Sequence, residues 1–242
     1  MDLTSIDDAN QWDVWPCSHD CTGFFKIDPA EVRAKIPAPL QLHLIDGRAH
    51  IEVGYARFRP SHGLPAFEEL SWGIAVVRVE GSGFAFYSPS LTSNEQGFLD
   101  YNEKIGFKVF PKVKIVSDLE RQQFAAYDQA GNEICVLRHQ PRDAFTLPFF
   151  LKKVFLKPTE VWTDGTGELQ SRTFDWRGTA RVYQSWPVAS TLNDHPFFQG
   201  VRVSRAEPVP YEMFSSTAIA KARQLFTFPR RKVVARRLNR LA

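Results

Sequence analysis

The sequence predicts a mainly β protein of the α+β class, with a few short helices around its strands. Runs rich in Val, Ile, Phe and Tyr recur along the chain between breaks of Gly, Pro, Asn or Ser, which is typical of β-strands separated by turns. The 16 Pro and 14 Gly are spread along the chain and mark no linker. With 242 residues, of which 43% are hydrophobic and 20 are Phe, the chain can bury a sizeable core. We therefore expect one domain that spans residues 1–242.

The first half of the chain is expected to begin with an arm and a short helix. Residues 1–20 are mostly polar, which favours an irregular N-terminal arm anchored by its two tryptophans. Asp28 followed by Pro29 predicts a helix start, because the Asp side chain can cap the first turn and proline suits the first helical position. Pro37 predicts the end of this helix. Strands are expected at residues 48–58, 70–80, 83–88 and 110–116, with a helical turn within residues 94–107.

Turn residues divide the second half of the chain into separate elements. The segment from Asp128 to Asn132 predicts a hairpin between strands at residues 122–127 and 133–139. The state of residues 145–155 stays open, because this apolar run contains Pro148. Another turn is expected at residues 164–167, one or two strands within 170–186, a strand at 201–207 and a helix at 210–225.

A lysine follows an aromatic-proline pair in Phe110-Pro111-Lys112, at the mouth of an apolar strand. Desolvation there would disfavour the ammonium form of Lys112 and provide a neutral amine that can attack a carbonyl. The alternative is a solvated lysine beside a proline that starts a strand.

Four blocks of sequence follow one another from about residue 24 to about residue 139. They are a helix with a Pro-x-Pro-Leu exit at residues 25–40, a strand with a glutamate at residues 51–53, an aromatic-x-Glu strand opening at residues 67–70, and Phe110-Pro111-Lys112. In this order the blocks resemble the acetoacetate decarboxylase family and its wider superfamily, in which a lysine after Gly-Tyr/Phe-Pro forms a Schiff base. The resemblance implies an antiparallel β-barrel or cone with peripheral helices, assembled into a homo-oligomer.

The resemblance also implies roles for single residues. Lys112 would form the Schiff base, and Glu52 and Glu69 would project from neighbouring strands toward it as acid/base groups. The alignment selects Glu69 over Glu68, because strand alternation lets only one of the two point inward. The alternative for Glu52 is an outward-facing strand glutamate.

Three further residues are candidates for substrate binding. Phe110 precedes the lysine, and Lys114 would lie on the same side of a strand as Lys112 and add positive field. Glu103 could cover the pocket entrance, the alternative being a solvated loop charge.

The sequence departs from the family at two functional positions. Val113 stands where the decarboxylase has a second lysine, and Ser18 or His19 stands where it has an arginine for the substrate carboxylate. Other alignments would place Val109 or Glu103 in the lysine position.

We therefore predict a carbon-carbon or carbon-oxygen lyase that acts on a keto acid or related carbonyl compound through an imine at Lys112, as a decarboxylase, aldolase or dehydratase. The alternative is a non-catalytic barrel that binds an apolar small molecule. No cofactor and no metal are expected: Cys17, His19 and Cys21 could supply zinc ligands, but the second pair of ligands is missing. The histidines have no acid at a spacing that suggests a catalytic triad.

The C-terminal segment, residues 229–242, is basic. Arginine, lysine and apolar residues alternate in it without an acid, which predicts a basic helix or tail that packs on its own domain or on a neighbouring subunit, the alternative being contact with anionic lipid. No motif that reads nucleic acid is present, and we expect no nucleic-acid partner. Three cysteines and the lack of an export signal or an apolar span predict a cytoplasmic protein.

Overall fold

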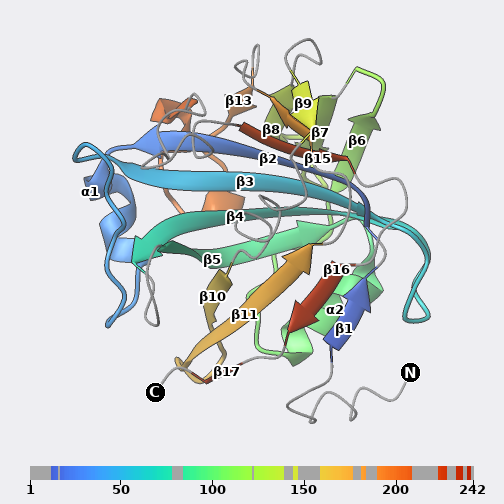
Figure 1. The fold of residues 1–242 in the computed structure, drawn as a ribbon, viewed down its shortest axis with the longest axis horizontal. Coiled ribbons are helices and arrows are strands. Elements are labelled where there is room, and N and C mark those ends of the chain that lie inside the picture. Colours follow the sequence, from blue (N-terminus) through green and yellow to red (C-terminus); the bar gives the residue numbers. More distant parts are fainter. Residues whose placement is uncertain are drawn as a thin grey trace.

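The computed structural model describes residues 12–15, 17–77, 84–121, 123–138, 144–146, 159–176, 181–183, 190–208, 223–227, 233–236 and 239–240. Most of these residues lie in a sheet of 13 strands and in a smaller sheet of four (Figure 1). The four strands of the small sheet are β6 (Lys114–Asp118), β7 (Gln123–Tyr127), β8 (Glu133–Arg138) and β13 (Thr191–Leu192). The strands of the large sheet are β1 (Trp12–Trp15), β2 (Cys17–Ile27), β3 (Ala49–Phe58), β4 (Phe67–Val77), β5 (Phe84–Ser93), β9 (Ala144–Thr146), β10 (Thr159–Thr163), β11 (Leu169–Trp176), β12 (Arg181–Tyr183), β14 (Glu207–Pro208), β15 (Arg223–Thr227), β16 (Val233–Arg236) and β17 (Asn239–Arg240).

The four long strands β2 to β5 pair antiparallel in chain order and form the middle of the large sheet. β10 pairs with β5 in parallel, so the sheet is mixed rather than purely antiparallel. Its described path ends at β1 on one side and at β9 on the other. The mainly β class is thus confirmed, but within the described residues the sheet is open and not the closed barrel or cone that we expected.

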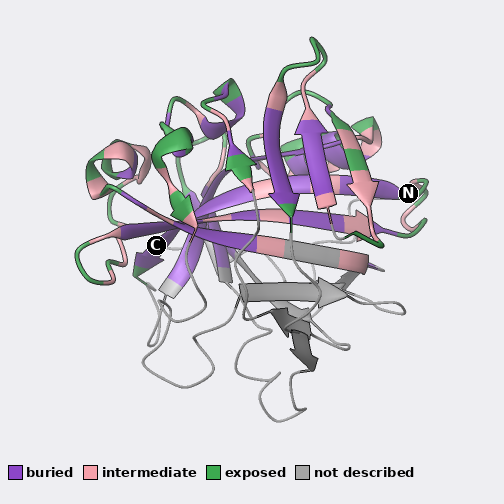
Figure 2. Ribbon diagram, turned by 90° about the horizontal axis from the view of Figure 1, so that it is seen from above, coloured by how far each residue is buried: buried purple, intermediate pink, exposed green. Residues whose placement is uncertain are grey.

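Strand alternation gives β2 to β5 two different faces. One face, which we call the core face, packs on the small sheet and carries Ile51, Val53, Tyr55, Leu70 and Trp72. Tyr55 stacks on Phe124 of β7, with ring centroids 4.0 Å apart. Figure 2 shows the small sheet lying over the long strands, whose middle is largely buried.

Two α-helices and three 3₁₀ turns complete the described part of the chain: α1 (Pro29–Val32), α2 (Gln96–Lys104), η2 (Arg33–Lys35), η4 (Pro196–Phe198) and η5 (Val203–Arg205). The predicted start of α1 is confirmed, because Asp28 accepts a hydrogen bond from the backbone N–H of Ala30 and Pro29 is the first helical residue. None of the helices in the described residues is long and apolar enough to cross a membrane.

Several expected elements are wrong. Residues 12–15 and 17–20 are strands rather than an irregular arm, because β1 pairs with β16 and β2 pairs with β3 and β15. The basic tail contributes the strands β16 and β17, which pair with β11, and not a helix in its described part. Residues 201–207 are a 3₁₀ turn followed by the two-residue strand β14. The helix predicted at residues 210–225 lies mostly outside the described residues, and its last three residues belong to β15.

Candidate functional site

The predicted acid/base residues Glu52 and Glu69 lie on one face of the large sheet, opposite the core face. Glu52 pairs with Phe24 of β2 and with Gly73 of β4, whereas Glu69 pairs with Ala56 of β3. Because Glu52 and Ala56 are four residues apart on one strand, their side chains share a face. We call it the glutamate face. The two glutamates are half-buried and are separated by roughly 13 Å along the strand direction, at ~3.3 Å per residue.

Glu68 lies on the core face instead. Its side chain is 9% exposed and accepts hydrogen bonds from the hydroxyls of Tyr55 and Ser117, each at 2.6 Å, and from the amide of Asn94 at 3.3 Å. Burial raises the pKa of Tyr55, and the hydrogen bond to Glu68 raises it further. Glu68 therefore joins β3, β4 and β6 inside the core, whereas Glu69 lies half-buried on the other face.

Gly54 lies between the two glutamates on the glutamate face, and it pairs with Thr22 of β2 and Ser71 of β4. A Cβ on Gly54 would lie 3.2 Å from the Ser71 hydroxyl and 3.6 Å from the Thr22 hydroxyl. The two hydroxyls therefore lie close over the backbone of Gly54, and all three residues are half-buried.

Glu52 occupies a gap, which exists because residue 73 is glycine. A Cβ on Gly73 would lie 3.1 Å from Glu52 Oε1 and 3.0 Å from the Cβ of Phe86. The rings of Phe86 and Phe24 have centroids 6.0 Å apart, and both side chains are buried. The carboxylate of Glu52 is thus accommodated beside two aromatic rings.

Sequence reasoning missed a third carboxylate, that of Glu160. This residue of β10 pairs with Phe86, so it belongs to the same face, and it is 9% exposed. Pairing between β5 and β10 joins segments that are distant in the sequence, and no local sequence pattern predicts it.

Lys112 lies at the edge of β5, next to Glu69. The backbone N–H of Val113 donates to the carbonyl of Ser93 (3.0 Å), and Ser93 is the register partner of Glu69. Lys112 and Glu69 are therefore about two strand spacings apart, or roughly 10 Å between their backbones. Val113 is buried in the core, whereas the side chain of Lys112 is exposed. Protein burial alone does not provide the desolvation that we expected for its amine.

The three predicted substrate-binding residues differ in their surroundings. Phe110 is half-buried and contacts the rings of His195 and Phe197. Lys114 is exposed and begins β6, so the strand starts four residues later than predicted. Glu103 is exposed near the end of α2, and in the described part of the chain no contact joins it to Glu52, Glu69 or Lys112. The functional roles of all six residues stay predictions.

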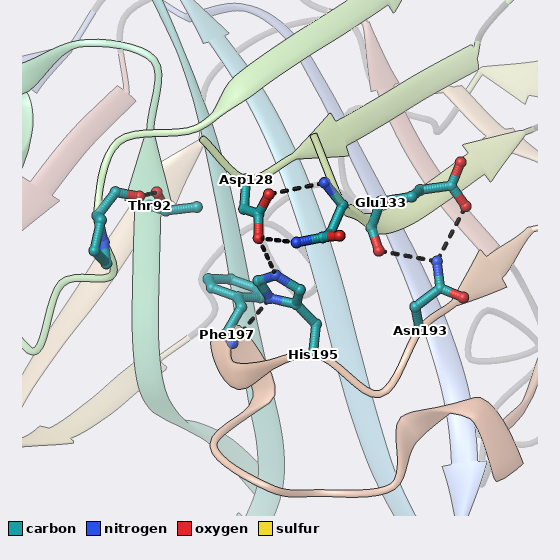
Figure 3. Close-up of polar contacts among 8 residues, drawn as sticks. Thr92, Asp128, Glu133, Asn193, His195 and Phe197 are labelled. Carbon is teal, nitrogen blue, oxygen red and sulfur yellow. Dashed lines mark hydrogen bonds and ion pairs between the residues drawn. The ribbon is translucent and has the colours of Figure 1, made fainter. Parts of the chain in front are cut away.

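A pair formed by the buried His195 and the half-buried Asp128 lies beside the lysine segment, and sequence reasoning did not find it (Figure 3). Nε2 of His195 is 3.2 Å from Oδ2 of Asp128, although the two residues are 67 positions apart in the chain. The hydrogen bond from the Asn132 side chain and that from His195 lower the pKa of Asp128 to about 2. The predicted hairpin turn at residues 128–132 is confirmed, and its first residue provides the acid of this pair.

No group of His, Cys, Asp and Glu side chains in the described residues has a geometry that could hold a metal ion. Cys17 and Cys135 are free and buried, and burial raises the pKa of Cys135 to about 12. The side chain of Cys21 lies outside the described residues.

Neither a protein-family model nor a curated protein matches the sequence. Solved structures do match it over nearly its full length. A structure of acetoacetate decarboxylase has a TM-score of 0.66 and 10% identity, covering 99% of this chain and 93% of its own. An acetoacetate decarboxylase-like enzyme from Sphingomonas wittichii RW1 has a TM-score of 0.59 and 14% identity, with coverages of 99% and 96%.

The enduracididine biosynthesis enzyme MppR, in complex with pyruvate, has a TM-score of 0.62 and 12% identity, with coverages of 99% and 95%. MppR is also similar to this chain in its complex with the condensation product of pyruvate and imidazole 4-carboxaldehyde. Identities this low establish the architecture alone. The chain therefore has the acetoacetate decarboxylase-like fold.

Proposed function

We propose that this protein is a small-molecule lyase that forms an imine between Lys112 and an oxo acid or related carbonyl compound. The observation that carries this proposal is the placement of Lys112 and Glu69 on either side of Ser93, with Glu52 farther along the same sheet face. An amine, and carboxyl groups that can act as acid and base, are the groups that imine chemistry requires.

In the proposed reaction, the neutral amine of Lys112 attacks the substrate carbonyl and gives a carbinolamine. Loss of water from this adduct needs a proton for the departing hydroxyl, and Glu69 is the nearer carboxyl group. The resulting iminium withdraws the electron pair of a breaking carbon-carbon bond, which leaves an enamine. The other fragment departs as carbon dioxide from a carboxylate, or as an aldehyde when its hydroxyl gives a proton to a carboxylate base. Protonation of the enamine carbon, for which Glu52 is our candidate acid, and hydrolysis of the imine then release the product.

Because Lys112 is exposed, a bound substrate would have to displace water from around the amine to favour its neutral form. The hydroxyls of Thr22 and Ser71 could hold a substrate oxygen over Gly54 during these steps. Val113 cannot supply the like charge that a second lysine would provide beside Lys112, so we propose that acetoacetate decarboxylation is slow compared with reactions such as aldol cleavage or dehydration.

A second candidate function is the binding of an apolar small molecule without covalent chemistry. The buried ring pair of Phe24 and Phe86 and the exposure of Lys112 favour it. In this case Lys112 is a surface ammonium, and the part of the glutamate face beside the two rings binds the ligand.

Borohydride trapping separates these functions. We expect incubation with pyruvate or acetoacetate, followed by reduction, to add the corresponding mass to the peptide that contains Lys112, and Lys112→Gln to lose this label. Lys108→Gln is the matched control, because Lys108 is an exposed lysine of the same segment without a predicted role, and it should retain the label. A label on another lysine would refute the assignment of Lys112. No label with any of a panel of 2-oxo and 3-oxo acids, together with saturable binding of an apolar probe, would favour the second function.

A further inference from the structure

The buried imidazole of His195 is held through both of its nitrogens. Nδ1 accepts a hydrogen bond from the backbone N–H of Phe197 (3.1 Å), and this contact caps the 3₁₀ turn η4. Nδ1 therefore carries no proton, and Nε2 donates its proton to Asp128 at 3.2 Å. The side chain is only 8% exposed, so this tautomer is fixed by protein groups (Figure 3).

Asp128 is fixed in turn by its own hairpin. Its Oδ1 accepts from the backbone N–H of Asn132, and its Oδ2 accepts from the side-chain amide of the same residue, both at 2.8 Å. The turn between β7 and β8 thereby holds the imidazole in one orientation, and the ring has little freedom to rotate.

The ring of His195 contacts the segment that carries Lys112. Its centroid is 5.4 Å from that of Phe110 at an interplanar angle of 69°, and Phe197 contacts the same Phe110 ring at 5.7 Å. Edge-to-face contacts of this kind favour one ring position over others. Phe110 is therefore held by an imidazole that is itself held by Asp128 and Phe197.

The backbone of the same segment is attached to β5. The N–H of Phe110 donates to the carbonyl of Leu91 (2.7 Å), the hydroxyl of Thr92 donates to the carbonyl of Pro111 (2.8 Å), and the N–H of Val113 donates to the carbonyl of Ser93 (3.0 Å). β5 thus fixes the segment along one side, while His195 and Phe197 fix the Phe110 ring. Lys112 lies between the attached residues, and its exposed side chain extends from a backbone with little freedom.

We infer that His195 is a positioning residue for Lys112. Its contact with the Phe110 ring fixes the backbone from which the Lys112 side chain extends. This inference rests on the proposed function, in which the Lys112 amine must meet a carbonyl bound near Glu69. A displacement of about 1 Å in a reacting group can cost as much as a hundredfold in rate. Loss of the imidazole should therefore slow imine formation without removing any group that takes part in the reaction.

The test compares His195→Asn with the wild-type protein. The asparagine oxygen can still accept the Phe197 N–H and cap η4, so the variant should fold, but it presents no ring to Phe110. We expect labelling of Lys112 at a saturating oxo-acid concentration to slow about tenfold or more, because the amine is misplaced. We also expect faster deuterium exchange at the amides of Phe110 and Val113.

Two turn aspartates provide a matched pair of variants. Asp128→Asn removes the anion behind His195, whereas Asp118→Asn alters the other turn of the small sheet, where Asp118 accepts from the N–H of Arg121 at 2.9 Å. We expect Asp128→Asn to slow labelling of Lys112 and Asp118→Asn to leave it unchanged, once both rates are corrected for the folded fraction.

The outcomes separate this inference from the proposed function. If the wild-type protein and His195→Asn label Lys112 equally fast and exchange these amides equally fast, His195 is not a positioning residue, and the proposed function stands. If the wild-type protein labels no lysine, the proposed function fails. Amide exchange then still decides whether His195 holds the segment: faster exchange in His195→Asn supports the holding contact, and unchanged exchange overturns it.

Discussion

Two adjacent glutamates on β4 have different environments, because neighbouring residues of a strand face opposite sides of a sheet. Glu68 accepts hydrogen bonds from Tyr55, Ser117 and Asn94 within the core. Glu69 is half-buried on the glutamate face, next to the segment that carries Lys112. This arrangement indicates a structural role for Glu68, and it is the basis of the functional role that we propose for Glu69.

We predict that Glu68→Ala lowers the free energy of unfolding by about 3 kcal/mol, because it leaves the buried Tyr55 hydroxyl and the half-buried Ser117 hydroxyl without their acceptor and opens a cavity. Glu69→Ala should cost less stability but should slow imine formation at Lys112. Urea denaturation and borohydride trapping measure the two effects. Equal losses of stability in the two variants would contradict the division of roles between these residues.

His50 gives the protein a predictable dependence on pH. This side chain is fully buried, and burial, helped by the positive charges of His43, Arg48 and Lys26, lowers its pKa from 6.5 to about 4. The folded state therefore binds a proton less readily than the unfolded state. The stability that the folded state gains by keeping His50 neutral is present above pH 6.5 and is lost as the pH falls toward 4.

We predict that the free energy of unfolding falls by on the order of 3 kcal/mol between pH 6.5 and pH 4 on account of His50. His50→Asn should show a shallower decline over this range, measured by urea denaturation at a series of pH values. Parallel curves for the wild-type protein and the variant would show that another group controls this part of the pH dependence.

At the scale of elements, the middle of the large sheet is shaped by two missing side chains. Gly54 and Gly73 leave room for the hydroxyls of Thr22 and Ser71 and for the carboxylate of Glu52. The positions of these polar groups on the glutamate face therefore depend on the two glycines of β3 and β4.

We predict that Gly73→Ala displaces Glu52 and costs about 1–3 kcal/mol of stability, because its Cβ would lie within 3.1 Å of Glu52 Oε1 and 3.0 Å of the Phe86 Cβ. Imine formation should slow by more than the loss of folded protein explains. Gly165→Ala is the matched control, since no heavy atom lies within 4 Å of a Cβ at that turn, and it should change stability by less than about 0.5 kcal/mol. If both variants trap substrate at the wild-type rate, the position of Glu52 does not matter for the chemistry.

Elements with local signals could be predicted from the sequence. Asp28 and Pro29 mark the start of α1, and the residues from Asp128 to Asn132 mark the hairpin between β7 and β8. Strand β1 and the start of β2 could not be predicted in this way, because they pair with strands more than 30 residues away in the sequence. Val201 and Val203 alternate with exposed residues, as in a strand. However, Val201 precedes η5 and Val203 begins it, and both are buried in the core. Asp194 accepts hydrogen bonds from the backbone N–H and the hydroxyl of Ser204 in this turn.

The candidate site could be predicted only in part, for the same reason. Strand alternation correctly separates the faces of Glu52 and Ile51, but it does not say which face packs on another sheet. The pairing of Asp128 with His195 and the place of Glu160 beside Phe86 come from contacts between distant segments. The exposure of Lys112 also depends on the whole fold, since Phe110-Pro111-Lys112 alone favours burial as readily as exposure.

At the scale of the whole molecule, the basic tail is part of the large sheet. β16 pairs on one side with β1 and on the other with β11, so it connects the N-terminal strand to the rest of the sheet. We propose, in addition, that the protein assembles with copies of itself, and that the tail contributes to stability through this pairing rather than by binding a membrane.

We predict that deleting the residues after Pro229 lowers the melting temperature by several degrees, because β1 loses its partner strand β16 and β11 loses both β16 and β17. If the tail also supports assembly, the mass measured by light scattering will fall. Neither form should bind anionic vesicles. An unchanged melting temperature together with salt-sensitive vesicle binding by the full-length protein would identify the tail as a lipid-binding element.

The pairing of β1 with β16 sets an order of events during synthesis. Trp12 is made long before its register partner Arg236. Until Arg236 has been made, the edge of β1 lacks this partner and is open to wrong pairing with other chains. The large sheet can be completed only once β16 is available, and contacts between such distant residues make this step slow.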